Sequence, residues 1–414
     1  MKRNRVVITG MGILAPNGTG HEPFWKSILS GESGIGPITL FDTNGFKSRI
    51  AGEVKNFDPL DYIEPDLKPK RMARHTQLAY AATMMALRDA QLDPDNLDLP
   101  GPVPVVIGIS TSAIDVIESV YNALQEKGPN RVPTTSSAAS IPQAAANTIA
   151  DRIGMAAHAA TVSSACPSGL DALAEAAALI RSGAADIAIA GGADAPITPL
   201  TMASFIASGL SSTRNGEPEK ASRPFDLERD SGVISEGAGV FVLENLERAE
   251  ARNAPIYLEI SGYGKQRDLD TTRPGSGLAG SMKIALANAC RTQTDVDYIC
   301  AYGPSHPVLD AVEVQSIKTV FGERAYEVPV SSIKGVTGNP LAAGGPFQVA
   351  ACALAFRDQL APPTANYEVS DPDCDLDFIP NRPRRLTLNC ALVNVRGIGG
   401  SASSLILNRI NGSK

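Results

Sequence analysis

The segment around Cys166 has the residue types and spacing of a cysteine nucleophile on a strand-to-helix turn. Residues 160–170 read ATVSSACPSGL, so an apolar strand runs into the cysteine, and an Ala-rich stretch follows to Arg181. Pro167 suits the first position of that helix, where the N–H that proline lacks is not needed. A helix N-terminus favours a thiolate, so Cys166 is a candidate nucleophile. The alternative is a small buried cysteine without chemistry.

The other cysteines and the histidines show no metal-binding or disulfide pattern. The six cysteines include no CxxC pair, and the four histidines include no HExxH spacing. Scattered cysteines of this kind fit a reducing compartment. We therefore expect neither a metal centre nor a disulfide framework.

Short apolar runs alternate with Ala-rich stretches, which predicts an α/β sheet with helices on its faces. The first half is expected to hold strands 6–9, 105–109, 161–164, 186–190 and 240–243 and helices 76–90, 141–152 and 170–181. The second half is expected to hold strands 257–261, 298–301, 328–331, 388–394 and 404–408 and helices 280–291, 310–321 and 345–357. No residue-level repeat is visible, but this rhythm predicts two similar halves, residues 1–253 and 254–414.

Length and composition narrow the function classes. The chain has 414 residues, 43% hydrophobic and 20% charged, which suits two folded domains of roughly 200 residues each. Its net charge of −7 and the lack of a basic tract argue against a nucleic-acid partner. Gly10 and Gly12 interrupt the first apolar run, which favours a buried strand over a signal peptide. Because no run of 18 apolar residues exists, we expect no membrane partner and a cytoplasmic protein.

Nearly the whole chain resembles the elongating, type II β-ketoacyl-acyl-carrier-protein synthases. The blocks that carry the resemblance are VVITGMG (6–12), SSAC (163–166), AGGA (190–193), SRPFD (222–226), EGAG (236–239), VSSIK (330–334) and CDLDF (374–378). The resemblance implies a thiolase-like fold, with two similar α/β halves in a five-layered α-β-α-β-α arrangement. The first half would carry the nucleophile Cys166, and the second half the other catalytic positions.

Three active-site positions depart from the pattern of the family. The histidine of its Asn-Ala-His-Gly-Thr-Ser-Thr-Pro segment falls on Tyr302, and the histidine after Lys-Ser-x-Thr-Gly falls on Asn339. The phenylalanine of the Gly-Phe-Gly-Gly loop, which gates the acyl pocket, is replaced by Ile398, which precedes Gly399. Three further family residues are retained: Lys334 and the supporting carboxylates Asp310 and Glu313.

These departures affect the two halves of the family's reaction differently. In the family, the cysteine takes an acyl group from the carrier protein and then attacks a malonyl-derived carbanion, while the two histidines polarise the malonyl carbonyl. The N–H groups of Cys166 and Ile398 can still form an oxyanion hole, and Asn339 is still a donor, as in related type III enzymes. Tyr302 titrates near 10 and cannot shuttle protons as an imidazole does, and such a loss typically lowers a rate about 10²–10⁴-fold. The resemblance thus implies a catalytic set, Cys166, Tyr302, Lys334 and Asn339, with acyl transfer kept and malonyl decarboxylation impaired.

The resemblance also assigns the pantetheine tunnel, to Ser305, His306 and Thr337. His306 takes the place of a family threonine, and either replaces the missing imidazole or is a tunnel-wall histidine without a catalytic part. Arg396 stands where the family often has phenylalanine, two residues before Ile398. A buried arginine there needs a partner such as a carboxylate.

A basic cluster lies in the region where the family docks its acidic carrier protein. It comprises Lys70, Arg71 and Arg74, with Lys68 beside them, and is suited to steering an acidic partner. The alternative is a solvated helix start.

Two functions remain open. One is a subunit that resembles a chain-length factor and pairs with an active synthase in fatty-acid or polyketide, for example aryl-polyene, biosynthesis. The other is an independently active 3-oxoacyl-acyl-carrier-protein synthase or acyltransferase that uses Cys166 with Asn339 and Tyr302 or His306. Either implies an acyl carrier protein and a second subunit, identical or homologous. Neither implies a cofactor beyond the phosphopantetheine that the carrier protein delivers.

Overall fold

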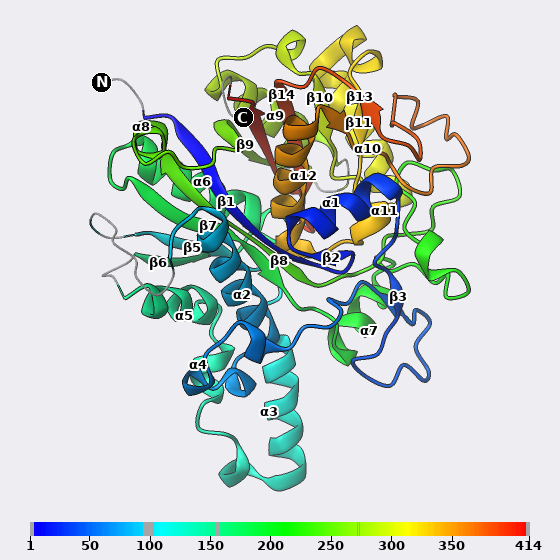
Figure 1. Cartoon of the computed structure of the whole chain (residues 1–414). Coiled ribbons are helices and arrows are strands. Elements are labelled where there is room, and N and C mark those ends of the chain that lie inside the picture. Colours follow the sequence, from blue (N-terminus) through cyan, green and yellow to red (C-terminus); the bar gives the residue numbers. More distant parts are fainter. Residues whose placement is uncertain are drawn as a thin grey trace.

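One large mixed sheet dominates the fold (Figure 1). The computed structural model describes residues 4–93, 101, 103–154, 158–270, 272 and 274–410. The sheet runs β11-β10-β14-β15-β9-β1-β8-β7-β5-β6. Its strands are β1 (Val6–Ala15), β5 (Val105–Gly108), β6 (Ala159–Val162), β7 (Ile187–Asp194), β8 (Gly237–Asn245), β9 (Leu258–Arg267), β10 (Tyr298–Cys300), β11 (Val330–Ser331), β14 (Cys390–Arg396) and β15 (Ser401–Asn408). Short pairings add β2 (Gly18–Thr19), β3 (Gly36–Pro37), β4 (Ile50–Ala51), β12 (Leu360–Ala361) and β13 (Arg384–Arg385).

The two halves of this sheet have the same strand order. The first half runs β6-β5-β7-β8-β1 and the second runs β11-β10-β14-β15-β9. If the strands of each half are numbered in chain order, both halves have the order 3-2-4-5-1 across the sheet. Antiparallel pairing of β1 with β9, with Val6 opposite Ile260, joins the halves. The expectation of two similar α/β halves is confirmed.

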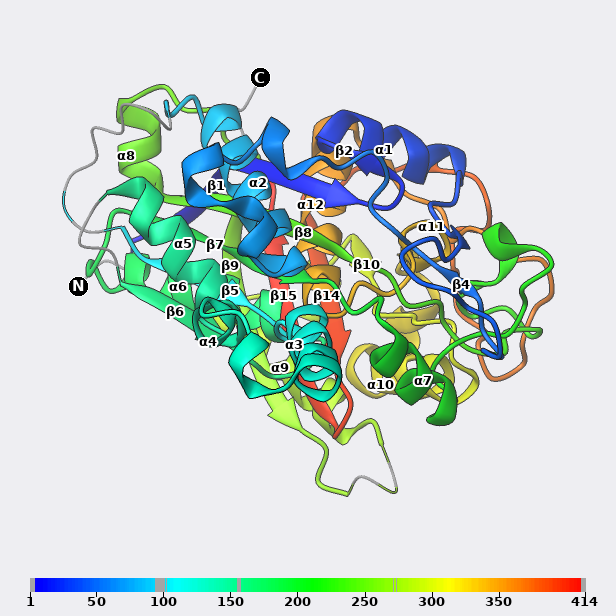
Figure 2. The same cartoon turned by 90° about the horizontal axis from the view of Figure 1, so that it is seen from below.

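Helices form three layers around the two half-sheets (Figure 2). The outer layer over the first half contains α2 (Arg74–Asp89) and α5 (Ala144–Ile153), and that over the second contains α9 (Ser276–Asn288) and α10 (Pro307–Phe321). The helices α6 (Ser168–Arg181) and α12 (Gly344–Asp358) lie between the half-sheets. They contact each other, and each of them contacts strands of both halves. This is the expected five-layered α-β-α-β-α arrangement. The remaining helices are α1 (His21–Ser30), α3 (Ile114–Lys127), α4 (Ser136–Ser140), α7 (Pro199–Ala207), α8 (Leu246–Ala251) and α11 (Lys334–Thr337).

Glycines in the first strand of each half let the outer helices approach closely. A Cβ on Gly12 would lie 1.9 Å from the carbonyl oxygen of Ala82 in α2. A Cβ on Gly264 would lie 2.1 Å from the carbonyl oxygen of Ser281 in α9. The pairs Gly10/Gly12 and Gly262/Gly264 occupy equivalent places, so the chain does carry a short residue-level repeat, contrary to the sequence-based expectation.

The predicted elements are all present, with shifted ends, but several helices were missed. The most prominent is α3, which has no buried residue and extends away from the main body in Figure 1. Among the described residues, no helix is long and apolar enough to cross a membrane.

Candidate active site

Cys166 lies on a tight turn between β6 and α6, as the sequence predicts. The residue before it, Ala165, has φ of 63°, a left-handed conformation that is strained for alanine and typical of functional turns. Ser168 closes the turn, because its hydroxyl donates to the Ala165 carbonyl and accepts from the N–H of Ser164. Pro167 has helical angles directly before Ser168, the first helical residue. Only 3% of Cys166 is exposed.

Tyr302 contacts the nucleophile from the second half of the chain. Its hydroxyl donates a hydrogen bond to Sγ of Cys166 at 3.7 Å. The ammonium of Lys334 lies 4.8 Å from the centre of the Tyr302 ring, a cation–π contact. Burial raises the pKa of the Tyr302 hydroxyl well above its ordinary value, so the phenol stays protonated and can donate a hydrogen bond but cannot act as a base near neutral pH.

Opposing influences set the protonation of the thiol. Burial raises the pKa of Cys166, whereas the hydrogen bond from Tyr302 and the charge of Lys334 lower it. The net direction is upward, against the thiolate that the helix N-terminus alone would favour. Burial likewise lowers the pKa of Lys334. The resting site therefore favours a neutral thiol beside a hydrogen-bond donor.

The retained carboxylates hold the main chain around Tyr302. Glu313 accepts from the N–H groups of Tyr302 at 2.9 Å and Gly303 at 2.8 Å. Asp310 accepts from the N–H groups of His306 at 3.1 Å and Phe225 at 2.8 Å. Both side chains are buried. They position this segment and do not face the thiol.

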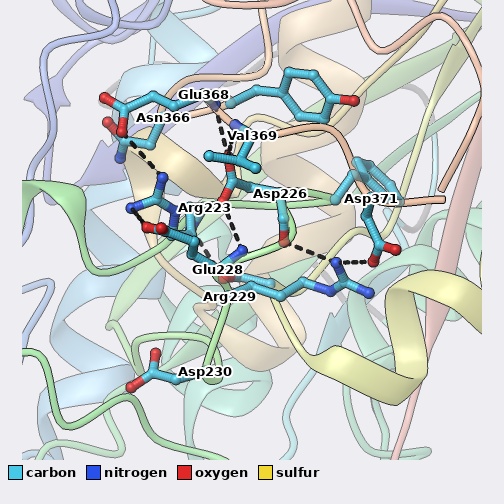
Figure 3. A network of polar contacts seen from close by, with 12 residues as sticks. Arg223, Asp226, Glu228, Arg229, Asp230, Asn366, Glu368, Val369 and Asp371 are labelled. Carbon is cyan, nitrogen blue, oxygen red and sulfur yellow. Dashed lines mark hydrogen bonds and ion pairs between the residues drawn. The ribbon is translucent and has the colours of Figure 1, made fainter. Parts of the chain in front are cut away.

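Arg229 also fixes this segment, and Figure 3 shows it within a network of polar contacts that includes Asp226 and Asp371. Its guanidinium donates to the carbonyls of His306 and Pro307 and to the carboxylate of Asp371. Arg223 and Asp226 form a second buried ion pair in this network, at 2.8 Å. Sequence similarity pointed to the 222–226 block but not to this supporting role.

The loop after β14 provides donors opposite the thiol. Neither the N–H of Ile398 nor that of Cys166 donates to another residue in the described part of the chain. Gly399 and Gly400 both have φ of 84°, which allows the loop to turn sharply, and the Ile398 side chain is 62% exposed. These two N–H groups are free to bind an oxyanion, as the oxyanion-hole prediction requires.

A cavity of about 50 Å³ adjoins the thiol. Three of the predicted catalytic residues line it, namely Cys166, Tyr302 and Asn339, and Lys334 lies behind the Tyr302 ring. The Oδ1 atom of Asn339 is buried and has no hydrogen-bond partner among the described residues. Phe205, Leu210, Leu309, Leu341 and Arg396 also line the cavity, and sequence reasoning did not place the first four there.

Two of the predicted tunnel residues lie outside this cavity. The hydroxyl of Ser305 donates to the carbonyl of Ser231, and that of Thr337 donates to the carbonyls of Ile333 and Gly338. Both residues are buried and are absent from the cavity wall. Their hydroxyls donate to the main chain, and their assignment to the pantetheine tunnel stays a prediction.

His306 lines the cavity and also caps a helix. Its Nδ1 atom accepts from the N–H groups of Val308 at 3.1 Å and Leu309 at 3.4 Å, at the start of α10. Burial and the charges of Arg229 and Arg396 lower its pKa. The imidazole is therefore neutral, with its proton on Nε2, and Nδ1 is not free to act as a base.

Only part of the predicted docking cluster is exposed. Lys70 and Arg71 lie on the surface. Arg74 instead donates through Nε and Nη2 to the buried carboxylate of Glu236, both at 2.6 Å. Arg74 therefore also has a structural contact, and its assignment to the docking cluster stays a prediction. Among the described residues, no group of His, Cys, Asp and Glu side chains could hold a metal ion.

Comparisons with known proteins place the whole chain in one family. Residues 3–249 match the family described as "Beta-ketoacyl synthase, N-terminal domain", and residues 257–368 match "Beta-ketoacyl synthase, C-terminal domain". The chain is 39% identical to 3-oxoacyl-[acyl-carrier-protein] synthase 2 of Coxiella burnetii, across 99% of this chain and 100% of that protein. It is 40% identical to putative polyketide beta-ketoacyl synthase 1 of Streptomyces halstedii, across 97% of both chains.

Solved structures agree with this assignment. One is a type II polyketide synthase acyl-carrier protein in complex with its ketosynthase bound to the hexaketide, 33% identical with a TM-score of 0.91, over 99% of this chain and 100% of that chain. Another is the ishigamide ketosynthase/chain length factor, 33% identical with a TM-score of 0.90 over the same shares. With its strand order, its buried cysteine turn and both family domains matched, the chain belongs to the β-ketoacyl synthase family and has the thiolase-like fold.

Proposed function

We propose that this protein accepts acyl groups from an acyl carrier protein onto Cys166, in fatty-acid or polyketide biosynthesis. The observation that carries the proposal is the grouping around Sγ of Cys166: the Tyr302 hydroxyl at 3.7 Å and the two unengaged N–H groups of Cys166 and Ile398. In this step, Sγ attacks the thioester carbonyl, the bond to the carrier's sulfur breaks, and the thiol proton passes to the departing sulfur. The N–H pair stabilises the oxyanion that forms between these events.

The second half-reaction is expected to be slow in this chain. It requires the malonyl carboxylate to leave as CO₂, after which the resulting enolate attacks the acyl carbon and releases Cys166. Tyr302 and Asn339 can donate hydrogen bonds to the malonyl carbonyl, but neither side chain carries positive charge or exchanges protons near neutral pH. The favoured role is therefore that of a subunit resembling a chain-length factor, paired with a homologous synthase that performs the condensation.

Two surface features support a second subunit. The sheet ends at β6, whose outer edge pairs with no strand of the described chain. Separately, α3 exposes Ile117, Tyr121 and Leu124, at 44%, 60% and 39%. An unpaired edge and an exposed apolar helix face are typical of surfaces that a partner covers.

An independent condensing enzyme is the second candidate, because the nucleophile, the oxyanion donors and Lys334 are all retained. Intact mass after incubation with acyl-carrier-protein thioesters tests the first step, with Cys166→Ala as the control. An adduct on the wild type alone supports acyl transfer, and no adduct from any donor on folded protein contradicts it.

Carbon dioxide release from malonyl carrier protein separates the two candidates. Release that needs an added homologous synthase with an intact Cys-His-His site supports the paired role. Release by the purified chain alone supports the independent enzyme.

A further inference from the structure

Arg396 is an unusual residue in the wall of the cavity beside Cys166. It is the last residue of β14, and only 8% of it is exposed. Its Nη2 atom donates to Oδ2 of Asp268 at 2.7 Å, so the carboxylate partner that a buried arginine requires is present.

Asp268, the partner of Arg396, is itself fixed by hydrogen bonds from the main chain. The other carboxylate oxygen of Asp268 accepts from the N–H groups of Gly275 at 3.0 Å and Gly277 at 2.7 Å, and the side chain is fully buried. Burial acts to raise the pKa of Asp268, but Arg396 and these N–H groups hold it below its ordinary value. The carboxylate is therefore ionised, and the guanidinium charge is already balanced.

The Nε donor of Arg396 is buried and has no hydrogen-bond partner among the described residues. Buried donors are almost always paired in folded proteins, so an unpaired one at a ligand cavity indicates a position for a ligand acceptor. His306, whose proton is on Nε2, contributes a second donor to the same cavity wall.

We propose that Arg396 is a specificity residue that binds an uncharged oxygen, keto or hydroxyl, on the acyl chain attached to Cys166. This inference rests on the proposed acyl transfer. An uncharged acceptor fits best, because a second carboxylate would leave the buried pair with a net negative charge. The cavity has room for about four water-sized groups, so the oxygen lies near the thioester end of the chain. Leu210, Leu309 and Leu341 provide apolar contacts for the rest of the group.

Three carrier-protein thioesters of equal carbon number test this assignment. Butyryl carries no chain oxygen, acetoacetyl carries a keto oxygen, and succinyl carries a carboxylate. We expect the wild type to acylate Cys166 with acetoacetyl about tenfold faster than with butyryl, judged by kcat/KM, and with succinyl slowest. The variant Arg396→Met with Asp268→Asn removes the pair without leaving a buried charge, and should lose the acetoacetyl preference, so that the acetoacetyl-to-butyryl ratio falls to about one.

Lys283→Met is the control, because Lys283 is an exposed cation on the outer helix α9. An acetoacetyl-to-butyryl ratio that is equal in wild type and variant overturns the assignment. So does an Arg396-dependent preference for succinyl, which would indicate an anion site.

Binding to Cys166→Ala keeps the test independent of acyl transfer. Calorimetry with acetoacetyl- and butyryl-pantetheine should give a lower Kd for acetoacetyl, and the paired Arg396/Asp268 variant in that background should abolish the difference. Equal Kd values overturn the assignment even if acyl transfer is confirmed. A difference in Kd without any transfer would sustain it while contradicting the proposed function.

Discussion

Tyr302 and Cys166 are 136 positions apart in the chain, yet the Tyr302 hydroxyl donates to Sγ of Cys166 at 3.7 Å. The contact arises because β10 ends beside the turn that carries the thiol, and Glu313 anchors the Tyr302 main chain there. A buried thiolate loses the stabilisation of water, so a single donor has a large influence on it. The side chain at the position of the family histidine is thus in contact with the Cys166 thiol.

Replacing Tyr302 by phenylalanine should make Cys166 less reactive. A hydrogen bond to a charged group is worth about 1.5–3 kcal/mol, or about one to two pKa units of the thiol. Because the thiolate is the nucleophile, alkylation of Cys166 by iodoacetamide below its pKa should slow about 10–100-fold, and the pH profile should shift upward. Peptide mapping measures this rate, with the exposed Cys290 as an internal reference. An unchanged profile would show that the hydroxyl does not stabilise the thiolate.

Restoring a histidine at position 302 should increase malonyl decarboxylation. Glu313 binds the N–H groups of residues 302 and 303, so the new side chain should start from the same main-chain position. A positioned imidazole typically contributes about 10²–10⁴ in rate, and we expect a gain in this range for Tyr302→His combined with Asn339→His. The assay is CO₂ release from malonyl carrier protein. Tyr302→Phe with Asn339→His controls for cavity shape, and equal rates in the two variants would contradict the prediction.

The local structure of the site was predictable, and its long-range pairs were not. The strand, Cys166 and the following helix are contiguous, so β-branched and Ala-rich patterns were enough to predict them. Asp268 and Arg396 lie 128 positions apart, and Arg74 and Glu236 lie 162 apart. Which carboxylate an arginine meets depends on strand order, which a residue pattern does not contain.

Two other features could have been recognised in the sequence. The helix α3 carries apolar residues at helical spacing, Ile117, Tyr121 and Leu124, so its pattern is that of an amphipathic helix, although this apolar face is exposed. The Gly-x-Gly pairs at 10/12 and 262/264 can also be read directly from the sequence. The reason for these glycines became clear only from the structure, in which α2 and α9 pack closely against them.

The stability of the fold should fall as the pH rises from about 4 to about 7, and level off above that. Burial raises the pKa of Asp310 to about 7, although the N–H groups of Phe225 and His306 and the charge of Arg229 oppose the shift. An acid whose pKa is raised on folding binds its proton more tightly in the folded state. Its stabilisation is therefore present at low pH and lost as the pH passes the folded pKa, with a slope of at most about 1.4 kcal/mol per pH unit.

Thermal unfolding of wild type and Asp310→Asn between about pH 4 and 8 measures this slope, most of which lies below pH 7. The variant should have a lower Tm throughout, because an amide cannot accept from both N–H groups through oxygen. Its Tm should also vary less with pH than that of the wild type. Parallel curves would assign the pH dependence to other groups.

Charge reversal at Lys70 and Arg71 should slow delivery of acyl groups by an acidic carrier protein. Both side chains are exposed, so their contribution is long-range attraction that salt screens. We expect Lys70→Glu with Arg71→Glu to lower kcat/KM for Cys166 acylation about 3–10-fold at low ionic strength, with a weaker salt dependence and unchanged Tm. Lys283→Glu, on the outer helix α9, is the matched control. Arg74→Ala should instead lower Tm, because it leaves the buried Glu236 carboxylate unpaired. If the double variant and Lys283→Glu slow acylation equally, net charge rather than this cluster attracts the carrier protein.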